Sequence, residues 1–306
     1  MSPVVEVDKL SKWYGNILGI VDVSLTIGTG IKGLLGPNGA GKSTFLKLIT
    51  GQLKPNIGTV KIFGLPLSSN PQLLTRVGYC PEYDSYYREM TGFEFIYSLV
   101  KLSGYDSGES VDKANQALVE VGLEERAGDL IKHYSLGMRQ RLRIAQSIAH
   151  HPDLLILDEP LKGVDPIWRN KIINIIKSYQ QQGKTVIVSS HILHEIEAMT
   201  EDIILINQGK VFAEGDIHYI RDLIKSHPHK IYVKTEESRK MAGGLINREE
   251  VLSINFSDQG LMVETLDRDK LLDLIAQLII EKNIEVKELT SPDDNLQAVF
   301  KYLTER

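Results

Sequence analysis

The sequence predicts an α/β protein with a mostly parallel sheet and helices on both faces, followed by a small α+β domain. Short apolar runs alternate with segments of helical periodicity across residues 30–206, as in strands joined by helical crossovers. After the His-Pro-His segment at 227–229, shorter apolar runs begin a new pattern. We therefore expect one domain over residues 1–226 and a small accessory domain over residues 227–306.

The composition is that of a folded chain without a strong charge field. Its 306 residues are 42% hydrophobic and carry a formal net charge of −5, which does not favour nucleic acid as a partner. No apolar run approaches the roughly 18 residues that cross a bilayer, and the first residues lack the pattern of a secretory peptide. The single cysteine, Cys80, fits a reducing compartment. We expect a cytoplasmic protein that meets a membrane only through a partner, as a peripheral protein on its cytoplasmic face.

The first part of the chain predicts an antiparallel β subdomain and the start of the core sheet. Residues 4–10 and 20–27 alternate apolar and polar residues in the period of half-buried strands. The apolar run at 31–35 leads into a glycine-rich loop, and residues 59–63 and 76–79 predict two further strands.

Helical periodicity dominates the next part of the chain. Residues 91–130 predict two helices joined by a polar connection, and residues 139–150 predict a third. Together they would form a helical insertion over about 91–150. In the first helix, Phe95, Leu99 and Leu102 would share one face.

After the insertion the pattern returns to alternating strands and helices. Residues 153–157 form a continuous apolar run, which predicts a strand buried on both faces of a parallel sheet. The segments that follow predict helices at 167–179 and 192–199, a strand at 185–188, and a hairpin of strands at 203–206 and 210–213.

The last part of the chain predicts a separate small domain. Its expected strands lie at 231–233, 251–256, 261–265 and 285–289, and its expected helices at 270–280 and 296–303. This order suits an α+β domain such as a ferredoxin-like sandwich.

The glycine-rich loop after residues 31–35 has the spacing G-x-x-x-x-G-K-S of a phosphate-binding loop. Backbone N–H groups would surround the phosphates, Lys42 would reach the β- and γ-phosphates, and the Ser43 hydroxyl would bind Mg²⁺. The alternative is a glycine-rich turn that binds nothing. The residues expected to bind the nucleotide, ATP, are Gly36, Pro37, Asn38, Gly39, Ala40, Gly41, Lys42, Ser43 and Thr44.

Two adjacent carboxylates end the apolar run at 153–157. Asp158 and Glu159 lie at the carboxyl end of the predicted strand, where open α/β sheets bind ligands. We expect Asp158 to hold Mg²⁺ beside Ser43, and Glu159 to polarise the attacking water. Taken alone, the pair could equally be a solvated turn.

The segment Tyr134-Ser135-Leu136-Gly137-Met138-Arg139-Gln140-Arg141 resembles the L-S-G-G-Q signature of ABC transporter ATP-binding subunits. The resemblance covers residues 4 to about 225 and implies a P-loop NTPase cassette of the ABC type, an ATPase. In this family two cassettes enclose two ATP molecules. Ser135 and Gly137, at the start of a helix expected near Met138, would therefore bind the ATP of a second subunit. The end of the chain, residues 288–300, resembles a terminal motif of subunits that serve ABC-2-type exporters.

Three further residues match family positions. The resemblance implies that Tyr14 stacks on adenine, that Asp165 lies on the loop that passes the partner's site, and that His191 bonds the γ-phosphate and aligns Glu159 with the water. A core tyrosine and a structural histidine are the alternatives. His194 is expected on the surface.

The chain also departs from the family pattern. Glu82 replaces a glutamine that touches Mg²⁺ and the water, and we expect it to keep a metal contact while altering the hydrolysis rate. Leu136 and Met138 replace a glycine and the glutamine of the signature, and Lys162 is basic where a small or polar residue is commoner. The aromatic residues of segment 82–95 match a groove that receives a membrane subunit's helix in this family, although core packing would also explain them.

The resemblance implies an ATP-hydrolysing subunit that dimerises on ATP, with a like or different second subunit, and drives export through a separate integral membrane permease. One alternative is a non-transport ABC ATPase that acts on the ribosome or nucleic acid. Another is an unrelated phosphate-loop enzyme such as a small-molecule kinase.

Overall fold

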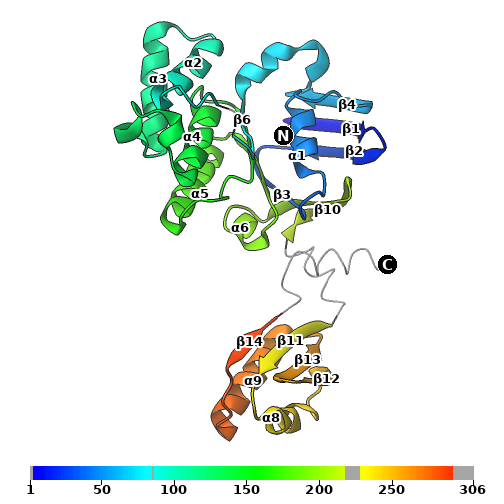
Figure 1. Ribbon diagram of the computed structural model, residues 1–306. Helices are drawn as coiled ribbons and strands as arrows, with labels where there is room; N and C mark the ends of the chain where they lie inside the picture. Colours follow the sequence, from blue (N-terminus) through cyan, green and yellow to red (C-terminus); the bar gives the residue numbers. More distant parts are fainter. Residues whose placement is uncertain (1–2, 85, 218–227, 292–306) are drawn as a thin grey trace. The chain divides into compact units, whose positions relative to one another are not determined.

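The computed structural model describes residues 3–84, 86–217 and 228–291 (Figure 1). The chain divides into two compact units, Met1–Gly215 and Asp216–Arg306. Within the described residues, no helix has both the length and the apolar character needed to span a membrane.

The first unit opens with an antiparallel sheet whose strand order is β2-β1-β4-β5. Alternation along the first strand places Val5 and Val7 in the core, as expected for a half-buried strand, and a register shift between Val7 and Leu10 returns the side chain of Leu10 to the core. The predicted antiparallel element is thereby confirmed. Its strands are β1 (Val5–Tyr14), β2 (Ile17–Ile27), β4 (Ile57–Ile62) and β5 (Leu65–Pro66).

The core sheet has the order β10-β9-β3-β8-β7-β6, and the pairs β3/β8, β3/β9, β7/β8 and β6/β7 are parallel. Every residue of β7 and β8 is buried, which explains the apolar runs at 154–157 and 186–188 within them. Because these strands run parallel, their carboxyl ends meet at one edge. The strands are β3 (Gly30–Leu35), β6 (Val77–Cys80), β7 (Leu154–Asp158), β8 (Thr185–Ser190), β9 (Asp202–Asn207) and β10 (Lys210–Asp216).

Helices α2 (Gly92–Leu102), α3 (Ser107–Glu120) and α4 (Leu136–Ile148) gather into one group in Figure 1. Capping boxes that start at Thr91 and Asp106 begin the first two helices. Of the residues expected on one face of α2, Phe95 is buried, whereas Leu102, the last residue of the helix, is 83% exposed.

The other helices of this unit flank the core sheet or connect its strands. The α-helices are α1 (Lys42–Ile49), α5 (Pro166–Gln181) and α6 (Leu193–Glu197). The short 3₁₀ helices are η1 (Leu67–Ser69), η2 (Pro71–Arg76), η3 (Glu124–Arg126) and η4 (Ile131–His133).

The second unit is an antiparallel sheet of order β12-β13-β11-β14 with two described helices. Its β-α-β-β-α-β sequence with this strand order is that of a ferredoxin-like sandwich. Helix α8 was not expected from the sequence, and the expected helix at 296–303 lies outside the described residues. The elements are β11 (His229–Lys234), α8 (Ser238–Leu245), β12 (Val251–Ser257), β13 (Gly260–Thr265), α9 (Arg268–Lys282) and β14 (Glu288–Thr290).

Candidate nucleotide site

The glycine-rich loop joins β3 to α1 at the carboxyl edge of the core sheet. Two of its glycines are required by close backbone approaches. A Cβ atom at Gly36 would lie 2.3 Å from the carbonyl oxygen of Ile206, and one at Gly41 would lie 2.6 Å from that of Gly19. Gly41 also has a φ of 106°, which side-chain-bearing residues rarely adopt. The loop leads directly into the N-terminus of α1, where the first N–H groups of a helix have no intrahelical partner and can bind an anion.

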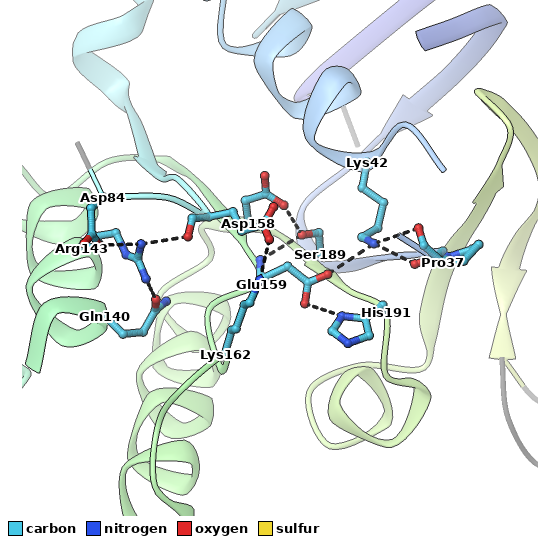
Figure 2. Close-up of polar contacts among 12 residues, drawn as sticks. Pro37, Lys42, Asp84, Gln140, Arg143, Asp158, Glu159, Lys162, Ser189 and His191 are labelled. Atoms are coloured by element: carbon cyan, nitrogen blue, oxygen red, sulfur yellow. Dashed lines mark hydrogen bonds and ion pairs between the residues drawn. The ribbon is translucent and has the colours of Figure 1, made fainter. Parts of the chain in front are cut away.

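Lys42 lies at the first position of α1 and its side chain is only 7% exposed. Its ammonium donates a hydrogen bond to the carbonyl oxygen of Gly36 at 2.7 Å and to that of Pro37 at 3.3 Å. It also lies 3.3 Å from the Oε1 atom of Glu159. Figure 2 shows the lysine pointing from the helix toward both the loop and the glutamate.

Asp158 and Glu159 follow one another at the end of β7 and are 1% and 6% exposed, which excludes a solvated turn. Burial raises the pKa of Asp158, while hydrogen bonds from Ser189 and Ser43 lower it. The Ser189 hydroxyl donates to Oδ1 of Asp158 at 2.6 Å. A carboxylate and a hydroxyl are oxygen ligands of the kind that Mg²⁺ takes alongside phosphate oxygens.

Glu159 contacts Lys42, Ser189 and His191. Its backbone is left-handed, with a φ of 51°, which turns the chain sharply after the strand. Its N–H group donates to the Ser189 hydroxyl at 3.0 Å, and its Oε2 atom lies 2.9 Å from Nδ1 of His191. The carboxylate thus lies between Lys42 and His191 (Figure 2).

The sequence did not single out Ser189 as a site residue. Its hydroxyl is fully buried, donates to Asp158 and accepts from the Glu159 backbone. The available sign was a polar residue at the end of an otherwise apolar strand, because buried hydroxyls require hydrogen-bond partners.

Glu82, in the loop after β6, bonds a residue of the loop after β7. Its Oε1 atom accepts a hydrogen bond from Nζ of Lys162 at 2.8 Å. The described residues contain no group of three or more His, Cys, Asp and Glu side chains suited to a metal ion. Mg²⁺ that is bound with nucleotide phosphates commonly uses one or two carboxylates, so the Ser43 and Asp158 pair still fits this ion.

A buried polar network that the sequence did not indicate joins α4 to these loops. Arg143 donates to the carbonyl oxygen of Glu82 at 2.8 Å and to Oδ1 of Asp84 at 3.0 Å, and it also bonds Gln140. Gln140 in turn donates to the carbonyl oxygen of Pro160 at 2.9 Å. Figure 2 shows both side chains reaching from the helix.

The signature residues lie in a different part of the unit. Helix α4 begins at Leu136, two residues before the expected start near Met138, because Ser135 is its N-cap and accepts from the Met138 N–H at 3.2 Å. Gly137 therefore lies in the first helical turn. In Figure 1, α4 belongs to the helical group and α1 does not.

The remaining site candidates are spread around the loop and sheet edge. Tyr14 is 45% exposed, so it is not a core tyrosine, and its hydroxyl lies 3.5 Å from Oγ1 of Thr44. Asp165 is exposed and caps α5 by accepting from the N–H groups of Ile167 and Trp168, both at 3.1 Å. His194 is exposed, as expected.

The aromatic segment after β6 divides into exposed and packed members. Tyr83 and Tyr87 are 70% and 78% exposed, whereas Phe95 is buried. Phe93 stacks on Tyr97, with ring centroids 5.8 Å apart. Core packing thus explains part of the segment, and of the two exposed tyrosines Tyr83 lies near Lys162, whose Nζ atom is 5.8 Å from its ring centroid.

Comparison with known proteins gives consistent relatives over the whole chain. The profile of the ABC transporter family matches residues 20–162. The chain is 31% identical to the daunorubicin/doxorubicin resistance ATP-binding protein DrrA of Streptomyces peucetius, over 98% of this chain and 92% of that protein. It is 32% identical to the bacitracin transport ATP-binding protein BcrA of Enterococcus faecalis, over 99% of this chain and 97% of that protein.

Solved structures similar to this chain are also ATP-binding subunits or cassettes of ABC transporters. One described as the ATP binding subunit of an ABC transporter has a TM-score of 0.66 and 30% identity, and the match covers 72% of this chain and 93% of that one. A dimeric ATP-binding cassette bound to ADP and Pi has a TM-score of 0.65 at 24% identity over 70% of this chain and 98% of that one, which shows a shared fold. The chain therefore belongs to the ABC transporter ATP-binding proteins, the ATPase subunits of these transporters.

Proposed function

We propose that this chain powers export through a separate membrane permease by closing as a dimer on ATP. The observation that carries the proposal is the position of the buried Glu159 carboxylate, between Lys42 and His191 at the mouth of the phosphate loop. Relatives named for drug resistance and bacitracin transport support an export role.

The buried residues at the sheet edge would bind the nucleotide and cleave it. Lys42 and the N–H groups of residues 36–44 would hold the phosphates, and Ser43 and Asp158 would hold Mg²⁺. Mg²⁺, when bound, supplies positive charge against the phosphate oxygens. Glu159 would accept a hydrogen bond from the attacking water, and His191 would hold the Glu159 carboxylate in line with it.

The exposed residues would complete the site of a second subunit. Ser135 and Gly137, at the N-terminus of α4, would meet the γ-phosphate bound by the partner, and Asp165 would pass close to it. Tyr14 would stack on adenine, because its ring is half-exposed beside Thr44. Each site is then composed of two subunits.

The permease would hold the dimer at the cytoplasmic face of the membrane. The exposed rings of Tyr83 and Tyr87 provide an aromatic surface of the kind enriched at the centre of protein interfaces. They lie in the loop that also carries Glu82, so a permease seated there would contact a loop that reaches the nucleotide site.

Isolation of the tagged chain from gently solubilised membranes tests this proposal. We expect it to co-purify with an integral membrane protein of several apolar helices, whose reconstitution with the chain should make ATP hydrolysis depend on both components. Co-sedimentation with ribosomes, without a membrane partner, would instead support a non-transport ABC ATPase and overturn the export role.

A further inference from the structure

The two charged residues that depart from the family pattern contact each other. Glu82 follows β6 and Lys162 follows β7, 80 positions later in the chain, and their Oε1 and Nζ atoms lie 2.8 Å apart. The Glu82 side chain is 18% exposed and that of Lys162 is 55% exposed, so the pair is partly shielded from water. An acid and a base that replace uncharged side chains thus form one ion pair.

The surroundings of Glu82 explain why it needs a cation. Its negative charge acts on Asp158 and contributes to the raised pKa of that carboxyl, and Glu159 lies at the same sheet edge. The ammonium of Lys42 lies 3.3 Å from the Glu159 carboxylate, and that of Lys162 lies 2.8 Å from the Glu82 carboxylate. Arg143 donates to the Glu82 backbone carbonyl and so fixes the backbone position from which the side chain extends.

We propose that Lys162 is the charge partner that permits a glutamate at position 82, and that the Mg²⁺·nucleotide complex competes with Lys162 for the Glu82 carboxylate. This inference rests on the proposed ATP-binding function. Lys162 is then a positioning residue, since it acts through Glu82. Before nucleotide binds, the pair ties the loop at 81–84 to the loop at 159–165, and binding weakens that tie.

The proposal predicts that loss of Lys162 changes the affinity for free ATP and the affinity for Mg²⁺·ATP in opposite directions. Without Lys162, the uncompensated Glu82 charge would repel ATP when Mg²⁺ is withheld. With Mg²⁺ present, the free carboxylate would instead bind the ion more readily. A residue that merely supports the fold would alter both affinities to the same extent.

The test compares the dissociation constant of a non-hydrolysable ATP analogue in EDTA with that in Mg²⁺, by calorimetry on the full chain. For Lys162→Met we expect the EDTA-to-Mg²⁺ ratio to rise about three-fold to five-fold, the upper range for a partly exposed ion pair. Lys162→Arg should keep the original ratio. Glu82→Gln combined with Lys162→Met should bring the ratio back, because the charge that needed a partner is gone.

A matched control breaks another ion pair of the same unit. Lys132→Met removes the contact with Glu89, 2.7 Å long, in the part of the chain around the helical insertion, and it should leave the ratio unchanged. A ratio for Lys162→Met within about twofold of the original, or an equal rise in the double variant, overturns the proposal. If the unaltered chain binds no ATP analogue, the proposed function itself is wrong. If it binds the analogue and the ratio does not respond to Lys162→Met, only the inference about Lys162 is wrong.

Discussion

The residues expected to bind nucleotide fall into two groups: a buried half around the phosphate loop and an exposed half at the start of α4. Around the phosphate loop, the side chains of Lys42 and Glu159 are 7% and 6% exposed and bond within the chain. At the start of α4, Ser135 is exposed and Leu136 is 54% exposed. The first half is thus organised by this chain alone, whereas the second presents its groups to the exterior. If the proposed function holds, the buried half would carry out the chemistry and the exposed half would make hydrolysis depend on a second subunit.

Lys42→Ala should break the buried half most severely. Removal of the ammonium leaves the Glu159 carboxylate without one of its buried partners, and the phosphates lose a cation. We expect hydrolysis to fall by about 10³-fold or more, with a lowered melting temperature. Phosphate release and a thermal melt measure the two effects, and Lys47→Ala in the same helix is the control. Near-normal hydrolysis by Lys42→Ala would show that the buried half is not the catalytic one.

Glu159→Gln separates binding from cleavage within the same half. The amide keeps the shape of the side chain but is a poor base, so turnover should drop by about 10² to 10³-fold while ATP still binds. The stalled, ATP-bound dimer should then be visible as an earlier peak in size-exclusion chromatography. A variant that binds ATP normally and yet remains a monomer would contradict the two-subunit site.

Ser135→Asp tests the exposed half without disturbing the fold. Aspartate is as good an N-cap as serine, so the start of α4 should be preserved, while its charge would repel the phosphates of the partner's nucleotide. We expect turnover to fall by about tenfold to 100-fold, from loss of one oxyanion contact, with the monomer's ATP affinity unchanged. Ser135→Ala loses both the cap and the phosphate contact, so it should lower the melting temperature in addition to turnover. An equal loss of monomer affinity in Ser135→Asp would place Ser135 in its own chain's site.

Tyr14→Ala should give the smallest effect, because the tyrosine ring is 45% exposed and would contribute a single stacking contact. Loss of one stacking contact should weaken ATP binding about fivefold, and Tyr14→Phe should restore it. Fluorescent ATP binding measures both variants. Unchanged affinity in Tyr14→Ala would remove the tyrosine from the adenine site.

Patterns within short segments predicted most of the fold. Alternation of apolar and polar residues predicted half-buried strands such as β1, and continuous apolar runs predicted fully buried strands such as β7. Both patterns are visible within one short segment of sequence. Helix α8 was not predicted because its sequence, SRKMAGGL, is short and contains two glycines, so helix propensity does not favour it. Packing of Met241 and Leu245 into the second core stabilises it instead.

The site was predicted where a motif is local and missed where it depends on distant pairing. The phosphate loop and the Asp158–Glu159 pair were visible in the sequence, whereas the partnership of Glu82 and Lys162 depends on two loops that only the parallel β6/β7 pairing brings together. The network of Arg143 and Gln140 was hidden for the same reason, because their partners lie on other elements.

Cys80 gives the molecule a chemical reporter of its own. It is the one cysteine of the chain, it ends β6 two residues before Glu82, and it is fully buried. Burial raises the pKa of its thiol to about 12, so alkylating reagents act only when this strand opens. The rate of alkylation therefore measures local unfolding beside the nucleotide site, without any engineered label.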